Sequence, residues 1–251
     1  MANTDRVDKN LFRDTHYLGK PADDVDKIIT RRISILEQYP EFFDTNADLI
    51  EVGSGSGATI TRLAHRFKSA TGIDIFDYTD EYKKQQLKNG DTISTFKKLD
   101  LEQEPLPGTY DRLISFEVIE HLRSDDSISK YNDLLRPGGL AAITVPNKWW
   151  IFETHGAKLP LLPWNRVPFF SWLPTPIHER YANARIYTRN RIERLFEKHG
   201  FTIIDTVYVT APMDVLKEGR LKDFVTKNIF KSDTTSSPFL ATSVFVLAKK
   251  K

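Results

Sequence analysis

The sequence predicts an α/β fold with a doubly wound sheet of seven strands, mostly parallel and with an antiparallel last strand. Three observations lead to this prediction. Short apolar segments alternate with segments of helical periodicity between residues 22 and 145, and this alternation is typical of a parallel sheet. The first strand-like segment breaks into alternate glycines at Gly53, Gly55 and Gly57. Two later segments, 201–209 and 243–249, form a strand pair without a helical crossover, as at the antiparallel end of a sheet.

Composition limits the classes of protein to which the chain can belong. With 251 residues, 40% of them apolar, it can bury one sizeable core. The net charge is +2 and charged residues are spread along the chain, which gives no electrostatic case for nucleic-acid binding. The absence of cysteine excludes disulfides and fits a reducing compartment. The start of the chain is polar and no long apolar run occurs, so we expect a cytoplasmic protein without a signal peptide or membrane span.

An N-terminal helical segment, residues 1–44, is expected to precede the main domain, residues 45–251. Residues 22–38 carry apolar side chains near helical spacing, and Pro40 ends that helix. Packing on the sheet is the simplest role for it. Tyr17, just before the helix, is a candidate to cover a bound cofactor.

The glycine-rich turn is the first candidate site. Residues 48–52 are typical of a short buried strand, and residues 58–67 of a helix with one apolar face. The glycines between them accept positive φ and let a ligand lie against bare backbone. A strand, a glycine turn and a helix N-terminus together predict a nucleotide-type site.

Acidic residues follow at the ends of the next two strands. Asp74 ends the second strand, 70–75, and lies 21 residues after Gly53. At this spacing an acid can accept hydrogen bonds from ribose hydroxyls. Asp100 follows the third strand and could meet an adenine amino group, with Leu101 on the ring. An ordinary surface acid at a strand end is the alternative for each of them.

The remaining elements of the sheet domain follow in order. We expect helices over 78–89, 124–135 and 189–199 and strands over 92–98, 111–116 and 140–145. Thr188 caps the last of these helices, and Gly200 closes it. Ligands of a doubly wound sheet bind at the carboxyl ends of its strands. The glycine turn, Asp74, Asp100 and Glu117 should therefore meet at that edge.

Residues 147–187 depart from the sheet pattern and form an aromatic-rich insertion. It contains all four tryptophans, and five prolines lie between Pro160 and Pro176. Such a stiff aromatic segment predicts a cap over an apolar or amphipathic substrate, whereas a satellite core and a membrane-surface patch are the alternatives. Its two histidines, His155 and His178, are candidate general bases. A second cap insertion is expected at about 211–239, where residues 213–230 look amphipathic.

Five motifs follow one another in the chain. They are Glu51-x-Gly53-x-Gly55-x-Gly57, Gly72-x-Asp74, Asp100-Leu101, Glu117-Val118-Ile119-Glu120-His121-Leu122 and Leu134-Leu135-Arg136-Pro137-Gly138-Gly139. In this order they resemble the class I S-adenosylmethionine-dependent methyltransferases, in the branch of the ubiquinone-type O-methyltransferases. The resemblance covers residues 45–147 and implies a Rossmann-like fold that binds S-adenosylmethionine. The candidate cofactor-binding residues are then Glu51, Gly53, Ser54, Gly55, Gly57, Asp74, Ile75, Asp100, Leu101, Glu117 and Tyr17.

A dinucleotide-dependent dehydrogenase is the main rival, because Gly53-x-Gly55-x-x-Ala58 also fits a dinucleotide fingerprint. Three features favour the methyltransferase. Glu51 lies inside the first strand, where a dinucleotide fold usually carries an apolar residue. Asp100 offers a second adenosine contact, and the box at 117–122 has no counterpart in dehydrogenases.

The box Glu117-x-x-Glu120-His121 is similar to one that binds a divalent ion in ubiquinone O-methyltransferases and small-RNA 2′-O-methyltransferases. Carboxylate and imidazole groups suit such an ion, for example Mg²⁺. An ion beside the sulfonium could hold a substrate hydroxyl and lower its pKa. The alternative is that Glu120 and His121 only cap and orient the next helix. His155 and His178 are candidate extra ligands.

The sequence therefore predicts an S-adenosylmethionine-dependent methyltransferase. Its partner is expected to be a small apolar or amphipathic acceptor, such as a lipid, quinone, glycoside or natural product, methylated on oxygen. The aromatic insertion could also contact a membrane surface. One alternative is a metal-assisted methyltransferase of RNA 3′ ends, and another is a non-catalytic cofactor-binding scaffold of the same fold.

Overall fold

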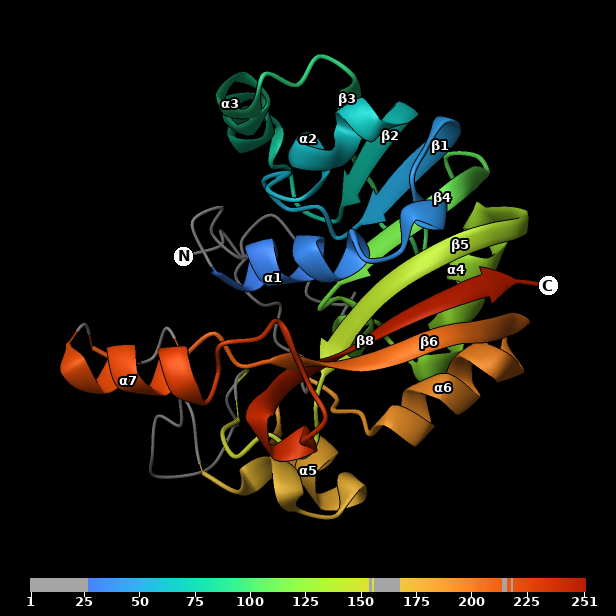
Figure 1. Cartoon of the computed structure of the whole chain (residues 1–251). Coiled ribbons are helices and arrows are strands. Elements are labelled where there is room, and N and C mark those ends of the chain that lie inside the picture. The colour runs from blue at the N-terminus through green and yellow to red at the C-terminus, as the bar shows by residue number, and fades with distance from the viewer. Residues whose placement is uncertain (1–26, 154, 156–167, 214–215, 218) are drawn as a thin grey trace.

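The computed structural model describes residues 27–153, 155, 168–213, 216–217 and 219–251 (Figure 1). Tyr17 lies outside these residues, so its predicted role over the cofactor stays a prediction. The N-terminal helix α1 (Lys27–Leu36) ends before Pro40, as the sequence predicted. Pro40 instead begins a short 3-10 helix, since proline can start a helix but not continue one.

One sheet of eight strands crosses the molecule in the order β3-β2-β1-β4-β5-β8-β6-β7 (Figure 1). The strands are β1 (Asp44–Val52), β2 (Phe67–Asp74), β3 (Ser94–Lys98), β4 (Tyr110–Phe116), β5 (Leu135–Pro146), β6 (Phe201–Thr210), β7 (Thr234–Thr235) and β8 (Ala241–Lys250). The first five pair in parallel, whereas β8 runs antiparallel to both β5 and β6. The predicted sheet with an antiparallel last strand is confirmed. The sheet has one strand more than predicted. This additional strand is β7, whose two residues are too few to show a pattern.

Helices cover both faces of the sheet. The α-helices after α1 are α2 (Ile60–Leu63), α3 (Thr79–Asn89), α4 (Ile128–Leu134), α5 (Thr175–Tyr181), α6 (Arg189–Lys198) and α7 (Arg220–Asn228). The 3-10 helices are η2 (Pro40–Phe42), η3 (Ala64–Arg66), η4 (Ile119–His121), η5 (Asp125–Ser127), η6 (Phe170–Trp172) and η7 (Pro238–Leu240). Buried side chains of α1, α2 and α3 form one core with the sheet, and those of α4 and α6 form the other. Because β1–β5 are parallel, their carboxyl ends lie at the same edge of the sheet.

The helix after the glycine turn is shorter than predicted. The expected helix over 58–67 is the four-residue α2 followed by the 3-10 turn η3, and Phe67 already belongs to β2. Its ring packs 6.2 Å from that of Phe42 and 5.8 Å from that of Phe43. This tertiary contact places Phe67 in a strand, although its spacing also fits a helical face.

The two predicted cap regions pack on each other. Trp150, Ala211 and Phe230 are buried together, and Val225 of α7 and Leu240 of η7 lie against them. The insertions thus contain a satellite core, and their role as a cap stays a prediction. None of the described helices combines the length and the apolar character needed to cross a membrane. Contact with a membrane surface also stays a prediction.

Candidate functional site

The glycine turn between β1 and α2 is folded onto the end of β2. Gly53, Gly55 and Gly57 have positive φ values of 72°, 51° and 83°, which is the backbone that glycine allows. The N–H groups of Gly53 and Ser54 donate to the carbonyl oxygen of Ile73 at 2.9 and 3.0 Å. The hydroxyl of Ser54 is buried and has no hydrogen-bond partner among the described residues. One polar group of the turn is therefore left for a ligand.

Glu51 points from β1 to the beginning of α2. Its Oε2 accepts a hydrogen bond from the N–H of Ile60 at 3.1 Å, and the residue is only 4% exposed. Burial raises the pKa of Glu51 to about 8. A helix N-terminus is where a dinucleotide pyrophosphate would bind. Here that position already holds the side chain of Glu51.

Asp74, the last residue of β2, binds the glycine turn through a hydrogen bond. Its Oδ2 accepts the N–H of Gly55 at 2.9 Å, and its Oδ1 accepts the N–H of Phe76 at 3.0 Å. Burial raises the pKa of Asp74 to about 6. A carboxylate oxygen has two lone pairs, so each oxygen can still accept one hydroxyl hydrogen. Ile75, the next residue, is half-buried beside this carboxylate.

Asp100 and Leu101 lie just beyond β3. Asp100 is half-buried, and its carboxylate accepts hydrogen bonds from the N–H of Glu102 and the side-chain amide of Gln103, both at 2.8 Å. Leu101 is 5% exposed and belongs to the core beneath the sheet edge. Both residues follow the carboxyl end of β3, as the sequence predicted. Their contacts with adenine stay predictions.

Glu117 follows β4 directly and has an unusual backbone, with φ of 59°. Its Oε1 lies 3.1 Å from a terminal nitrogen of Arg32 on α1. Arg32 is buried, and its guanidinium carbon lies 5.7 Å from the ring centroid of Phe116. Helix α1 therefore brings a cation to the carboxyl edge of the sheet, in addition to packing on it.

Sequence reasoning missed Arg32, although a signal was present. Arg32 lies three residues from Ile29 and three from Ile35, so it sits within the buried stripe of α1. A charged residue in such a stripe requires a buried partner. The identity of that partner, Glu117, depends on the fold.

Replacement of Arg32 by methionine should lower the free energy of unfolding by about 2 kcal/mol, because Glu117 would be left partly buried without its cation. Urea unfolding at pH 7 measures this. The double variant Arg32→Met/Glu117→Gln should recover part of the loss. Arg189→Met breaks an ion pair in which Arg189 is 44% exposed and should cost at most about 0.5 kcal/mol. An equal loss for Arg32→Met and Arg189→Met would contradict the proposed burial effect.

Arg185, at the end of the aromatic insertion, holds the segment that follows Glu117. Its guanidinium donates to the carbonyl oxygens of Ile119 and Leu122, both at 2.7 Å, and lies 3.1 Å from the carboxylate of Asp125. These contacts fix η4, which carries Glu120 and His121. Sequence reasoning missed Arg185, because its partners are more than 60 residues away and no local pattern marks the pairing.

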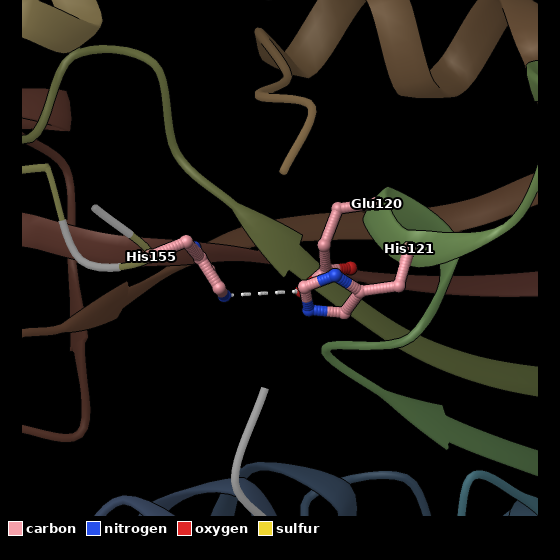
Figure 2. Close-up of side chains that lie close together, drawn as sticks. All are labelled: Glu120, His121 and His155. Carbon is pink, nitrogen blue, oxygen red and sulfur yellow. Dashed lines mark ion pairs between the residues drawn. The ribbon is translucent and has the colours of Figure 1, made fainter. Parts of the chain in front are cut away.

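Glu120, His121 and His155 converge in one group, and Figure 2 shows His155 reaching toward the other two from the opposite side. One ligand atom from each residue lies within 4.8 Å of the others. Oε1 of Glu120 is 3.6 Å from Nε2 of His155 and 3.9 Å from Nε2 of His121. Glu117, the other predicted ligand, pairs with Arg32 and is not part of this group.

This group fits a divalent ion. Glu120 is fully buried, and neither of its carboxylate oxygens accepts a hydrogen bond from the described residues. Burial, and secondarily the charge of Glu117, raises the pKa of Glu120 well above its usual range. A carboxylate without donors is costly to bury, whereas a cation between it and two imidazoles would compensate.

The two predicted base candidates differ in their surroundings. Burial lowers the pKa of His155, which favours the neutral imidazole that can accept a proton or bind a metal. His178 on α5 is fully buried, and its Nε2 lies 2.6 Å from Oε2 of Glu153. His155 thus belongs to the convergent group. His178 does not, and contacts Glu153, which in turn contacts His155.

Comparison with known proteins gives one family. The model described as "Methyltransferase domain" matches residues 24–206. The ubiquinone biosynthesis O-methyltransferase of Dechloromonas aromatica is 27% identical, over 65% of this chain and 75% of that protein. A highly reducing polyketide synthase of Aspergillus niger is 25% identical over 55% of this chain, which spans 7% of the synthase. The chain spans less than two thirds of the length of the first relatives that it matches.

Solved structures give the same fold. A crystal structure of an S-adenosylmethionine-dependent methyltransferase from Clostridium acetobutylicum ATCC 824 matches with a TM-score of 0.56 and 13% identity, over 91% of this chain and 92% of that one. At this identity the match concerns the fold alone. It agrees with the doubly wound sheet and its antiparallel β8.

Proposed function

The chain belongs to the methyltransferase-domain family, and from this membership we propose that it transfers the methyl group of S-adenosylmethionine to an oxygen of a small apolar or amphipathic acceptor. The observation that supports this best is the arrangement at the carboxyl edge of the sheet. Asp74 binds the glycine turn there and Val118, next to Glu117, lies against Gly53. Glu120 and His121, which converge with His155, follow Glu117 in the same box.

The geometry of the turn favours this cofactor over a dinucleotide. The N–H groups of Gly53, Ser54 and Gly55 already donate to acceptors on β2. Glu51 lies at the start of α2 and already accepts the N–H of Ile60, which a pyrophosphate would otherwise bind. The unpartnered hydroxyl of Ser54 and the second lone pairs of Asp74 instead suit a neutral nucleoside with a zwitterionic tail.

The protein's own residues would act mainly by alignment. Asp74 would accept the ribose hydroxyls, and the bare glycine backbone would let the methionine part lie close to the turn. Glu117, fixed by Arg32, would border the cleft in which acceptor and donor meet. When bound, S-adenosylmethionine supplies a methyl group already activated by its sulfonium. Orientation and exclusion of water would then account for most of the acceleration.

The group of Glu120, His121 and His155 would hold a divalent ion such as Mg²⁺. When bound there, the ion would lower the pKa of an acceptor hydroxyl. His155 must be neutral to serve as a ligand, and its lowered pKa meets that requirement. Without an ion, the same neutral imidazole could accept the hydroxyl proton as a general base.

Two observations support a small amphipathic acceptor. A relative that covers 65% of this chain is named for ubiquinone biosynthesis. The satellite core of Trp150, Ala211 and Phe230 joins both insertions beside the carboxyl edge, where they would cap an apolar substrate. Incubation with labelled S-adenosylmethionine and long-chain alkyl catechols or hydroxyquinones tests this. Transfer to an RNA 3′ end instead, or cofactor binding without any transfer, would contradict the proposal.

Asp74→Asn should weaken S-adenosylhomocysteine binding by about 10–100-fold, because a charged hydrogen bond contributes roughly 1.5–3 kcal/mol. Isothermal titration calorimetry measures this, and Asp80→Asn, an exposed position on α3, is the control. Since the pKa of Asp74 is raised to about 6, wild-type affinity should fall as the pH is lowered through 6. The Asn variant should lack this dependence. Equal affinities at pH 7 would refute the ribose assignment.

A further inference from the structure

A second buried pair of ionisable side chains lies behind the candidate ion site. Nε2 of His178 is 2.6 Å from Oε2 of Glu153, and neither side chain is more than 1% exposed. Neither residue belongs to the group that converges on Glu120. A buried pair of this kind is weak evidence for stability, because desolvation opposes the attraction between the partners. Its position relative to His155 offers a better explanation.

Glu153 connects this pair to the ion site. Its second oxygen, Oε1, accepts the backbone N–H of His155 at 2.9 Å and lies 3.9 Å from Nδ1 of the His155 ring. Asn183 donates a hydrogen bond to the carbonyl oxygen of His155 at 3.0 Å. The backbone of His155 is therefore held on both its N–H and its C=O side. Glu153 is in turn paired with His178 of α5, and Asn183 follows α5 in the chain.

His178 is itself held firmly. It lies on α5, its N–H donates to the carbonyl oxygen of Pro174 at 3.0 Å, and its ring centroid is 5.1 Å from that of Phe170. Helix α5 thus positions His178, whose ring contacts Glu153, and Glu153 binds the backbone N–H of His155. At the far end of this chain of contacts, Nε2 of His155 faces Glu120.

We propose that Glu153 and His178 are positioning residues that hold His155 in place as the third ligand of a divalent ion. Neither of them belongs to the group that would contact the ion. Partners behind a ligand commonly set its orientation and typically contribute 10–100-fold to metal affinity. This inference rests on one part of the proposed function, the divalent ion. It does not depend on the cofactor or on the acceptor. It assigns His178 a role other than that of a general base.

The test uses the full chain with Mn²⁺ as the probe and calorimetry as the readout. Glu153→Leu removes both hydrogen bonds at similar volume and should weaken Mn²⁺ binding by about 10–100-fold. Glu153→Gln can still accept from His155 and should lose less. His178→Leu should resemble Glu153→Leu, and His155→Ala should lose at least as much. His65→Gln, at an exposed histidine of η3, should bind Mn²⁺ like the wild type.

Titration of every variant with S-adenosylhomocysteine separates the possible failures. Wild-type cofactor affinity in Glu153→Leu shows that the variant is folded and that the cofactor site is independent of the ion site. Unchanged Mn²⁺ affinity in both Glu153→Leu and His178→Leu would overturn the positioning role, as would a wild type that binds no Mn²⁺. If the wild type does not bind S-adenosylhomocysteine, the proposed function is refuted, whereas the Mn²⁺ comparison between variants stays valid.

Discussion

Glu51→Gln should make the protein more stable at pH 8, by up to about 5 kcal/mol. Glu51 is 4% exposed, and burial raises its pKa from the ordinary 4.5 to about 8 in the folded chain. Between these two values the unfolded chain releases a proton that the folded chain retains. Wild-type stability should therefore fall as the pH rises from about 4.5 to 8, by at most 1.36 kcal/mol per pH unit. Glutamine does not titrate, so the variant avoids this loss.

The measurement is urea unfolding of both proteins at pH 5, 6.5 and 8 without cofactor. The difference between them should be small at pH 5 and largest at pH 8. The Gln oxygen can still accept the N–H of Ile60, so the start of α2 should persist. Glu81→Gln, the same chemical change at an exposed position of α3, is the matched control. A difference for Glu51→Gln that is independent of pH would show that burial does not govern this carboxyl.

The position of Glu51 also illustrates what the sequence could and could not predict. An acid within an apolar strand is visible in the sequence, and it favoured the methyltransferase family, to which the chain belongs. The start of α2 at Ile60 was not visible, because residues 58 and 59 fit a helical face equally well. The carboxylate of Glu51 bonds to the N–H of Ile60, and this tertiary contact fixes the helix start.

The acids at strand ends were predictable for a general reason. Alternation of strands and helices requires a parallel sheet, and the carboxyl ends of parallel strands share one edge. Asp74 and Glu117 were therefore expected near the glycine turn. Asp74 accepts the N–H of Gly55, and Val118, the residue after Glu117, lies against Gly53. This argument needs only the order of elements along the chain.

The contacts of the insertion were not predictable in the same way. His155 lies 3.6 Å from Glu120, and Arg185 reaches Ile119 and Leu122 from more than 60 residues away. No periodicity sets where an aromatic, proline-rich segment folds back. The sequence could name His155 as a candidate ligand by residue type, but the choice between His155 and His178 required the packing of α5.

The glycine turn permits a prediction nearly as large as that for Glu51. Gly53→Ala should lower the free energy of unfolding by about 4 kcal/mol and S-adenosylhomocysteine affinity by at least 100-fold. Two costs combine. A Cβ at this position would lie 2.2 Å from Cγ2 of Val118, and such overpacking typically costs 1–3 kcal/mol. The φ of 72° adds about 1–2 kcal/mol for any residue with a Cβ.

Gly90→Ala separates these two costs. Gly90 closes α3 with a φ of 65°, and a Cβ there would meet nothing within 4 Å. Its substitution should therefore cost only the backbone contribution, about 1–2 kcal/mol, and leave cofactor affinity unchanged. If Gly53→Ala proves no more harmful than Gly90→Ala, the contact with Val118 does not constrain the turn.

A double variant tests whether the turn and the box at 117–122 act as one unit. Val118 directly follows Glu117, so a shift of Val118 away from a new Cβ would displace the carboxylate that pairs with Arg32. Gly53→Ala/Val118→Ala removes the atom at 2.2 Å, although Cβ of Val118 remains at 3.3 Å. We expect about half of the lost stability to return, together with part of the cofactor affinity. Recovery of stability without affinity would mean that the turn itself, rather than its contact with the box, shapes the cofactor site.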